Sequence, residues 1–301
     1  MATAYYDLNV LVDDENPSVT VRKVEQLISL GYQVVALNRI HTVCAKRKSN
    51  GKKVVKKTDV NTISPENILA MLENRPDNFK LLSRVTVLLE SHEHVRELQS
   101  DYVKSFDIVA VRPTSLKLFQ QVCTQIELVD IISMELDSRV PFKTGYKAFG
   151  AAVARGIFVE ISYASAIRSS SLRQSVLANG IHIATRCRGR GIILSSSAEH
   201  YMEFRAPYDV ANLGLLFGLT ERNSKLAVTK NCYDVTLHAY SRSQTAKSVI
   251  TMRRIGDPMS ALESIVKMKN EDVNTGEPVM SEIPIIKQAE DLDGDQEIAM
   301  L

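Results

Sequence analysis

The sequence predicts a TIM-like (β/α) barrel, and three observations support this fold class. Short apolar segments, typical of strands covered on both faces, alternate with amphipathic helical segments along residues 1–254. Seven or eight such units in about 240 residues fit a closed barrel better than an open doubly wound sheet. No glycine-rich turn follows the first strand, which argues against a dinucleotide-binding sheet. Because no clear eighth strand is found, we expect a barrel that is either distorted or one strand short.

The first half of the chain contains four of the predicted strands and the helices between them. The first helix begins at Pro17, a residue that fits a first helical turn, and ends at Gly31. The second begins at Ser64-Pro65, and the third covers residues 91–99. The strands are predicted at residues 6–12, 34–37, 81–89 and 107–111.

The second half continues the same alternation up to the last predicted strand. A helix capped by Ser115 follows the fourth strand, and a helix at residues 167–178, weakened by three consecutive serines, precedes the last strand. The remaining segments are strands at residues 128–134, 157–161 and 192–194, and helices at residues 149–154 and from residue 221 onward.

The helix that begins at Pro207 is the most apolar one. Leu213, Leu216 and Phe217 form its apolar face, and two glycines nearby are small enough for close packing. The composition is consistent with a core helix, a subunit contact or both.

Residues 41–61 form a strongly basic loop. Seven cations occur within twelve residues around Ser49-Asn50-Gly51, too many to pack in a core. They are Lys46, Arg47, Lys48, Lys52, Lys53, Lys56 and Lys57. A phosphate-binding loop and a solvated flexible loop explain this composition equally well.

Charge divides the chain into two parts. Residues 255–301 contain eleven Asp/Glu and three Lys, a net charge of −8, so residues 1–254 carry 34 basic and 24 acidic side chains, or +10. A basic body at residues 1–254 with an acidic tail is a common layout of nucleic-acid-binding proteins, although ordinary surface charge gives similar values. The tail, residues 255–301, lacks sustained apolar periodicity and is predicted to be disordered.

Composition also bears on the cellular setting. No window of about 18 apolar residues exists, so we expect no membrane span. The N-terminal residues MATAYYDLN have neither the basic nor the apolar region of a secretory signal. The four cysteines are widely spaced and form no zinc pattern, so reduced thiols in the cytosol or nucleus are expected.

Two places in the chain offer candidate metal ligands. Asp7 and Asn9 end the first strand, where many barrel hydrolases bind metal, but hydrogen bonding at the barrel mouth is the stronger interpretation. His92 and His94 begin a helix, where side chains two residues apart point in different directions. Together with His182, these residues define the alternative function, a metal-dependent barrel phosphoesterase similar in layout to polymerase-and-histidinol-phosphatase domains.

Arginine is the main candidate for binding. Its planar guanidinium binds phosphate at two oxygens and stacks on bases, so clustered arginines suit folded RNA. A buried ion pair is an equally good explanation for Arg84, inside an apolar strand, and for Arg205, near Glu203. Three arginines between residues 186 and 190 lie at the mouth of the last predicted strand. The predicted RNA-binding residues are Arg84, Arg112, Arg168, Arg173, Arg186, Arg188, Arg190, Arg205, Lys46, Arg47, Lys48, Lys52 and Lys53.

Five segments of the chain together match one protein family. The longest is FRAPYDVANLGLLFGLTERNSKLAVTKNC at residues 204–232. The others are DLNV at residues 7–10, LGYQVVALN at 30–38, LSRVTV at 82–87 and FDIVAVRP at 106–113. With these motifs the chain resembles the family of the thirty-kilodalton protein subunit shared by ribonuclease P and ribonuclease MRP. The resemblance implies a β/α barrel.

The resemblance also implies a function. The protein would be an RNA-binding accessory subunit, while RNA and its bound Mg²⁺ perform the cleavage of the 5′ leader from precursor tRNA, and the protein itself would bind no cofactor. Because the family's subunit is shared with ribonuclease MRP, the resemblance implies a second role in ribosomal RNA processing. Family members pair with a smaller α/β subunit and other ribonuclease P/MRP proteins, sometimes with two copies in one assembly, in the nucleus and nucleolus.

Overall fold

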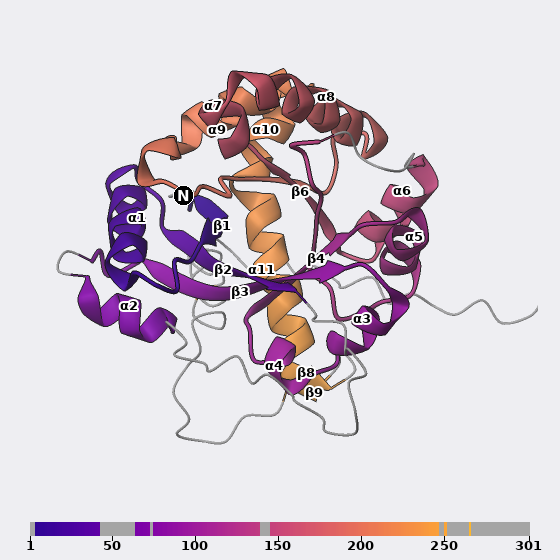
Figure 1. Cartoon of the computed structure of the whole chain (residues 1–301), viewed down its shortest axis with the longest axis horizontal. Coiled ribbons are helices and arrows are strands. Elements are labelled where there is room, and N and C mark those ends of the chain that lie inside the picture. The colour runs from indigo at the N-terminus through magenta and orange to yellow at the C-terminus, as the bar shows by residue number, and fades with distance from the viewer. Residues whose placement is uncertain are drawn as a thin grey trace, which may run out of the picture.

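Seven parallel strands form one sheet in the computed structural model, which describes residues 4–42, 64–72, 75–138, 145–246, 250–251 and 265. The spatial order of the strands follows the sequence, β1-β2-β3-β4-β5-β6-β7, and the helices lie outside them (Figure 1). The strands are β1 (Tyr6–Leu11), β2 (Val34–Thr42), β3 (Lys80–Leu89), β4 (Ile108–Pro113), β5 (Ile131–Ser133), β6 (Phe158–Ser162) and β7 (Ile192–Ser195).

The sheet curls until its two edges nearly meet. Val10 on β1 forms a parallel bridge with Ala198, just beyond β7, and the Ser197 amide donates to the Asn9 carbonyl at 2.9 Å. The predicted TIM-like barrel is therefore confirmed as a nearly closed one of seven strands, and no eighth strand joins it within the described residues. A separate antiparallel pair is formed by β8 (Thr245–Ala246) and β9 (Ile250–Thr251).

The helices mostly follow the predicted positions. The Ser115 side chain accepts a hydrogen bond from the Leu118 amide at 3.4 Å, which confirms the predicted cap. They are α1 (Pro17–Ser29), α2 (Pro65–Met71), α3 (His92–Glu97), α4 (Asp101–Lys104), α5 (Leu116–Thr124), α6 (Tyr146–Ala154), α7 (Ala164–Arg168), α8 (Ser170–Arg186), the 3₁₀ turn η1 (Tyr201–Glu203), α9 (Pro207–Leu216), α10 (Glu221–Ala227) and α11 (Lys230–Gln244). No helix in these segments is both long and apolar enough to cross a membrane.

Two helical predictions were wrong in their boundaries. The helix predicted at residues 167–178 is α7 followed by α8, which continues to Arg186. The single helix predicted from residue 221 is broken between α10 and α11, where the Val228 carbonyl accepts from the Tyr6 amide at 3.2 Å. The break lets the chain turn under the barrel.

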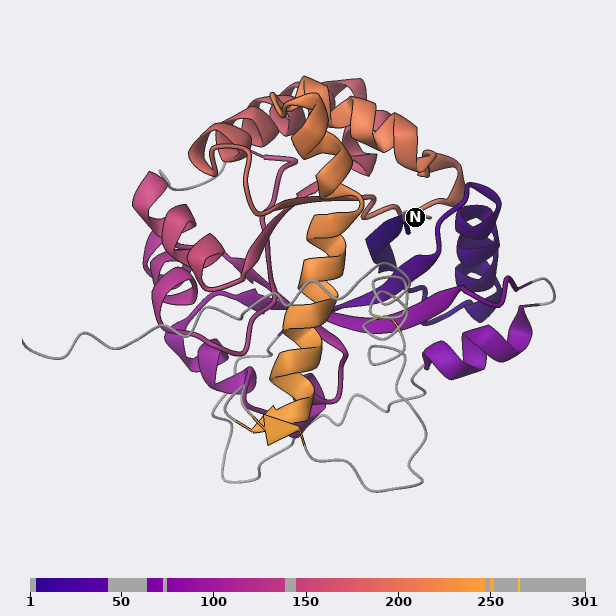
Figure 2. The same ribbon diagram turned by 180° about the vertical axis from the view of Figure 1, so that it is seen from behind.

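Helix α11 crosses the opening formed by the amino ends of the strands (Figure 2). At one end of the helix, Asn231 Nδ2 donates to the carbonyl of Ile192, the first residue of β7, at 2.7 Å. Near the other end, Arg242 Nη2 donates to the carbonyl of Asp107, just before β4, at 2.8 Å. The amino end of the barrel is therefore closed by a helix, and the carboxyl end is the end at which barrels carry their sites.

Alternation along the strands gives the barrel interior two zones. Near the amino ends the inward residues are apolar, such as Leu8, Leu82 and Ile131, and pack against α11. The next inward positions, Arg84 on β3 and Glu160 on β6, are charged and buried. The inward-facing side chains thus change from apolar near the amino ends of the strands to charged at the next inward positions. This change marks the middle of the barrel interior as a polar site.

The C-terminal part is described at a single position. Ile265 is buried in the apolar cluster at the amino end of the barrel, so the chain is packed there. The other residues of 255–301 lie outside the described residues, and the disordered acidic tail stays a prediction.

The two glycines of the α9 region have different roles. A Cβ on Gly214 would lie 2.6 Å from the Ser224 hydroxyl and 3.0 Å from Leu194 Cδ1, so the predicted close packing is confirmed there. Gly218 has open space around it but a φ of +81°, so it is required for its left-handed backbone rather than for packing.

Candidate functional site

A buried ion pair occupies the middle of the barrel. Arg84 Nη1 lies 2.6 Å from Glu160 Oε1, and Arg84 Nη2 lies 2.7 Å from Glu160 Oε2. The side chains of the two residues are 0% and 1% exposed. This two-pronged geometry is the strongest arrangement that an arginine and a carboxylate can adopt.

Neutral polar groups add further hydrogen bonds to the pair, although Arg84 Nε has no partner among the described residues. Glu160 also accepts from Ser195 Oγ at 2.8 Å and from Asn9 Nδ2 at 3.2 Å. Arg84 Nη1 donates to the Leu8 carbonyl at 2.6 Å. Burial opposes ionisation of Glu160, but the Arg84 charge and the hydrogen bonds from Arg84, Ser133 and Ser195 outweigh it and hold the pKa of Glu160 below its usual value.

Asp7 lies at the edge of this network with one oxygen unused. Its Oδ1 accepts from the amides of Asn9 at 3.1 Å and Ser196 at 3.2 Å, whereas Oδ2 is buried without a partner among the described residues. Burial raises the pKa of Asp7 to about 6. Asp7 and Asn9 thus serve hydrogen bonding at the barrel mouth, the stronger of the two interpretations of these residues.

The interior does not resemble a metal centre. Within the described part of the chain, no three His, Cys, Asp or Glu side chains gather closely enough to hold a metal ion. The positive charge beside Glu160 is the fixed guanidinium of Arg84.

The histidines named as metal candidates are dispersed. His92 Nδ1 lies 2.9 Å from Gln121 Oε1, while His94 Nδ1 lies 3.3 Å from the Leu88 carbonyl. The two rings point in different directions, as predicted from their positions at the start of a helix. His182 lies on α8.

The arginine prediction was wrong for Arg84. A side chain with no exposed surface and a buried carboxylate partner cannot reach an RNA phosphate. The equally weighted explanation, a buried ion pair, is the correct one.

Four of the predicted arginines lie near the carboxyl ends of the strands, and the structure gives each a protein partner. Arg112 Nη1 lies 2.8 Å from Glu135 Oε2. Arg173 Nε donates to the Ala166 carbonyl at 2.8 Å, and Arg205 Nη1 donates to the Phe204 carbonyl at 2.7 Å. These partners leave the three side chains only partly available to RNA.

The fourth, Arg168, takes the partner that was assigned to Arg205. Arg168 lies 2.6 Å from Glu203 and 2.6 Å from Glu199. The expected pair of Arg205 with Glu203 was therefore wrong, because the chain turns at η1 and directs Glu203 towards α7.

The other three arginines lie at the opposite end of the barrel. Arg186 is the last residue of α8 and stacks 4.5 Å above the Tyr146 ring, while Arg188 and Arg190 are exposed in the turn before β7. In the described segments none of the three forms an ion pair. A helical rise of 1.5 Å per residue separates Arg173 from Arg186 by about 20 Å, so the predicted arginines form two groups rather than one cluster.

Arg188 adopts a backbone conformation that usually requires glycine. Its φ is +53°, and it follows the last turn of α8. The Gly189 amide donates to the Ala184 carbonyl at 2.9 Å and the Arg188 amide to the Thr185 carbonyl at 3.1 Å, the bond pattern of a Schellman motif. The arginine therefore occupies the position of the motif where glycine is least strained.

The lysine-rich loop is not placed. Lys46, Arg47, Lys48, Lys52 and Lys53 lie outside the described residues, so their predicted RNA contacts stay predictions.

Sequence reasoning assigned the apolar face of α9 only in part. Phe217, just after α9, is buried, but Leu216 is 58% exposed. Tyr208 and Leu215 are exposed on the same helix, and Met202 lies exposed on η1 before it. We call these four side chains the α9 patch. Several large apolar side chains left exposed along one short segment are typical of an interaction surface.

Comparison with known proteins gives consistent matches. The family model described as RNase P subunit p30 matches residues 4–244. Ribonuclease P protein subunit p30 of Mus musculus is 36% identical over 233 residues, covering 77% of this chain and 84% of that protein. Probable ribonuclease P protein subunit 3 of Schizosaccharomyces pombe is 34% identical over 253 residues, covering 82% and 98%.

A solved structure supports the fold. One chain in the cryo-EM structure of archaeal ribonuclease P with mature tRNA has a TM-score of 0.59 and 15% identity, covering 84% of this chain and 100% of that chain. Because the family model spans nearly the whole barrel and two relatives match at 36% and 34% identity, the chain belongs to the RNase P subunit p30 family.

Proposed function

We propose that this chain is an RNA-binding accessory subunit of ribonuclease P and ribonuclease MRP. The observation that carries the proposal is the Arg84–Glu160 pair, which places a fixed ion pair in the barrel interior of a member of the RNase P subunit p30 family. A barrel whose interior is occupied in this way binds partners through its outside. Cleavage of the 5′ leader of precursor tRNA is then performed by the RNA, with Mg²⁺ held on that RNA.

The RNA-facing surface in this proposal is the group Arg186, Arg188 and Arg190. Its members have no carboxylate partner among the described residues, so no internal ion pair must be broken before they contact phosphate. Each arginine that neutralises a phosphate releases counterions and strengthens binding at low salt. The partnered arginines at the other end of the barrel and the 46–53 loop provide further contacts.

The protein-facing surface in this proposal is the α9 patch. The resemblance to the family implies a smaller α/β subunit as the partner, with two copies of the pair in some assemblies. The patch combines a tyrosine, a methionine and two leucines, and tyrosine and methionine are enriched in interface cores. The relatives from Mus musculus and Schizosaccharomyces pombe are eukaryotic ribonuclease P subunits, which supports action in the nucleus. Action in the nucleolus is proposed from the expected role in ribosomal RNA processing.

Reconstitution tests the function. Ribonuclease P assembled with this chain is expected to remove the 5′ leader from precursor tRNA faster than the same assembly without it. The purified chain alone, with Mn²⁺ or Zn²⁺, is expected to cleave neither precursor tRNA nor a simple phosphoester. Stoichiometric bound metal with turnover in the absence of RNA would instead establish the phosphoesterase.

A further inference from the structure

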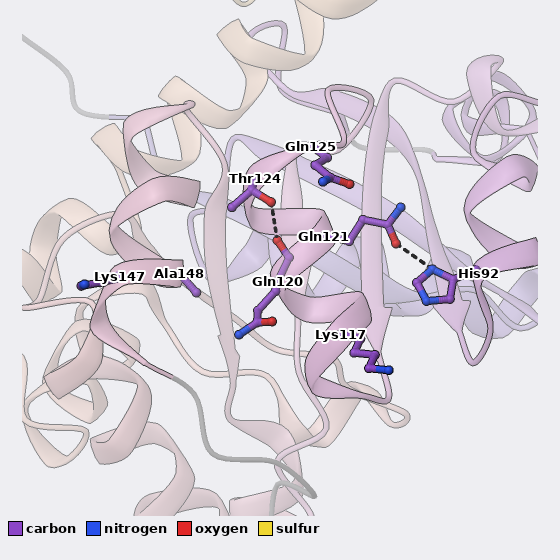
Figure 3. Close-up of a pocket in the computed structure, with 8 residues that line it drawn as sticks. All are labelled: His92, Lys117, Gln120, Gln121, Thr124, Gln125, Lys147 and Ala148. Atoms are coloured by element: carbon purple, nitrogen blue, oxygen red, sulfur yellow. Dashed lines mark hydrogen bonds between the residues drawn. The ribbon is translucent and has the colours of Figure 1, made fainter.

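The outer face of α5 forms a polar groove between α3 and α6 (Figure 3). The groove has a volume of about 640 Å³. Its lining residues are His92 from α3, Lys117, Gln120, Gln121 and Thr124 from α5, Gln125 just after it, and Lys147 and Ala148 from α6. We call this feature the α5 groove. It lies on the outside of the barrel, apart from the interior network. Its α6 side adjoins the β7-turn arginines, because Arg186 stacks on Tyr146, the residue before Lys147.

The lining of the α5 groove is cationic and rich in carboxamides. Lys117 and Lys147 are exposed on two different helices, and no carboxylate is among the lining residues. His92 Nδ1 lies 2.9 Å from Gln121 Oε1, which fixes one wall. Gln120 and Gln125 are exposed and present both amide donors and carbonyl acceptors.

This combination is typical of a site for a nucleic-acid strand. The lysines match phosphates, and the carboxamides match the mixed donors and acceptors of base edges and of the ribose 2′-hydroxyl. An acidic peptide would also match the lysines and could hydrogen-bond the glutamines through its backbone, so it is the competing occupant that the test must separate from RNA.

We infer that the α5 groove is a second RNA-binding site that holds an unpaired strand, with Lys117 and Lys147 on phosphates and Gln120 and Gln125 on bases or ribose. The inference rests on the proposed function and adds a site beside the arginines of the β7 turn, since Arg186 stacks on Tyr146 next to Lys147. An unpaired strand fits because its base edges are free to meet the carboxamides.

Charge removal tests the lysines in the full chain. Lys117→Gln with Lys147→Gln is compared with Lys225→Gln with Lys230→Gln, two exposed lysines on α10 and α11. The probe is an oligouridylate of about 20 nucleotides, titrated over a range of salt concentrations. Loss of two phosphate contacts on a single strand is expected to make the negative slope of log association constant against log salt shallower by about 1.4. Binding should weaken about 25-fold at about 0.1 M salt. The control pair is expected to keep the wild-type slope.

Neutral substitutions test the glutamines. Gln120→Ala with Gln125→Ala removes hydrogen bonds but no charge, so affinity should fall several-fold at every salt concentration while the slope stays that of the wild type. Melting temperatures of all variants should match the wild type, because every substituted side chain is exposed.

Three results would overturn the inference, and they differ in what they mean for the proposed function. A wild-type slope in the Lys117/Lys147 variant, with a reduced slope in an Arg186/Arg188/Arg190 variant, removes the α5 groove and keeps the RNA-binding subunit. Poly-glutamate is titrated in the same way as the oligouridylate. If the Lys117/Lys147 variant loses poly-glutamate binding but keeps RNA binding, the groove is a site for an acidic protein segment. Absence of RNA binding by the wild-type chain defeats both the groove and the proposed function.

Discussion

At the scale of single residues, Arg188 shows the strongest conflict between stability and function. A non-glycine residue at φ +53° is strained, and the exposed guanidinium gains no ion pair in the described structure to offset that strain. A strained residue held at the surface is a mark of a functional site. We interpret Arg188 as kept for what it binds.

Arg188→Gly is therefore expected to stabilise the chain and weaken RNA binding. Relief of the left-handed conformation should raise the free energy of unfolding by about 1 kcal/mol. Arg190→Gly is the matched control, since it removes the same charge at an exposed position that is not among the positive-φ residues. Urea denaturation and RNA titration of both variants check this. If the two glycine variants are equally stable, Arg188 is not strained.

Asp7 gives the residue-scale prediction for pH. Its pKa is about 6 in the folded protein against an ordinary 3.8, so between these values the native state binds more protons than the unfolded state and stability falls as pH rises. Asp7→Asn removes this cost and is expected to stabilise the protein at pH 7 by up to about 3 kcal/mol. Glu160 acts in the opposite sense, because its pKa is lowered.

The measurement for Asp7 is the difference between variant and wild type. Urea midpoints are taken at pH 4 and at pH 7, and the Asp7→Asn advantage should be present at pH 7 and small at pH 4. Since Glu160 is unchanged in both proteins, its contribution cancels in the comparison. An advantage that is the same at both pH values would show that Asp7 carries no buried charge.

At the scale of elements, α11 is held under the barrel by one buried carboxylate. Asp130 is 0% exposed and lies 3.1 Å from Arg242 and 2.8 Å from His238 Nδ1, both on α11. Arg242→Ala removes the arginine charge that offsets the cost of burying the Asp130 carboxylate. The substitution is expected to lower the free energy of unfolding by about 3 kcal/mol. Arg222→Ala, at an exposed position on α10, should change it by less than about 0.5 kcal/mol.

Hydrogen exchange distinguishes a local from a global effect of Arg242→Ala. Faster exchange of α11 amides, before those of β3 and β4, would show that the helix detaches from the amino end of the barrel. A stability equal to that of Arg222→Ala would mean that Asp130 does not hold α11.

The α9 patch is tested by placing a charge in it. Leu216→Asp should leave the free energy of unfolding within about 0.5 kcal/mol of the wild type, because the side chain is 58% exposed, and should weaken capture of the small α/β subunit. Gln99→Glu adds the same charge at an exposed position just after α3, away from the α9 patch, and should leave capture unchanged. Equal capture by wild type and Leu216→Asp would exclude the patch as the subunit contact.

At the scale of the whole molecule, the sequence predicted what depends on local pattern. All seven barrel strands were found because buried parallel strands are apolar runs, and β5 alone proved much shorter than its run. The end of α8 was missed because its interior contains polar residues and Gly180, which weaken a helical signal although the glycine packs against Phe217.

Pairing between distant residues was beyond the sequence. Arg84 and Glu160 meet across the barrel only because the curled sheet directs a side chain of β3 and a side chain of β6 into the same interior. The separation of the arginines into two groups likewise depends on the length of α8. Position in the fold, rather than residue type, decides which guanidiniums remain free for RNA.

The central claim is that unpaired arginines at the β7 turn bind RNA for a catalyst that the protein itself does not contain. The most direct test is the salt dependence of binding to ribonuclease P RNA by the Arg186→Ala, Arg188→Ala, Arg190→Ala chain, compared with Arg75→Ala, Arg96→Ala, Arg222→Ala at three other exposed arginines. The account predicts that the negative slope of log association constant against log salt becomes shallower by about 2.7 in the first variant, because three phosphate contacts are lost. The slope of the control variant should equal that of the wild type. Equal slopes for the wild type and the first variant would contradict it.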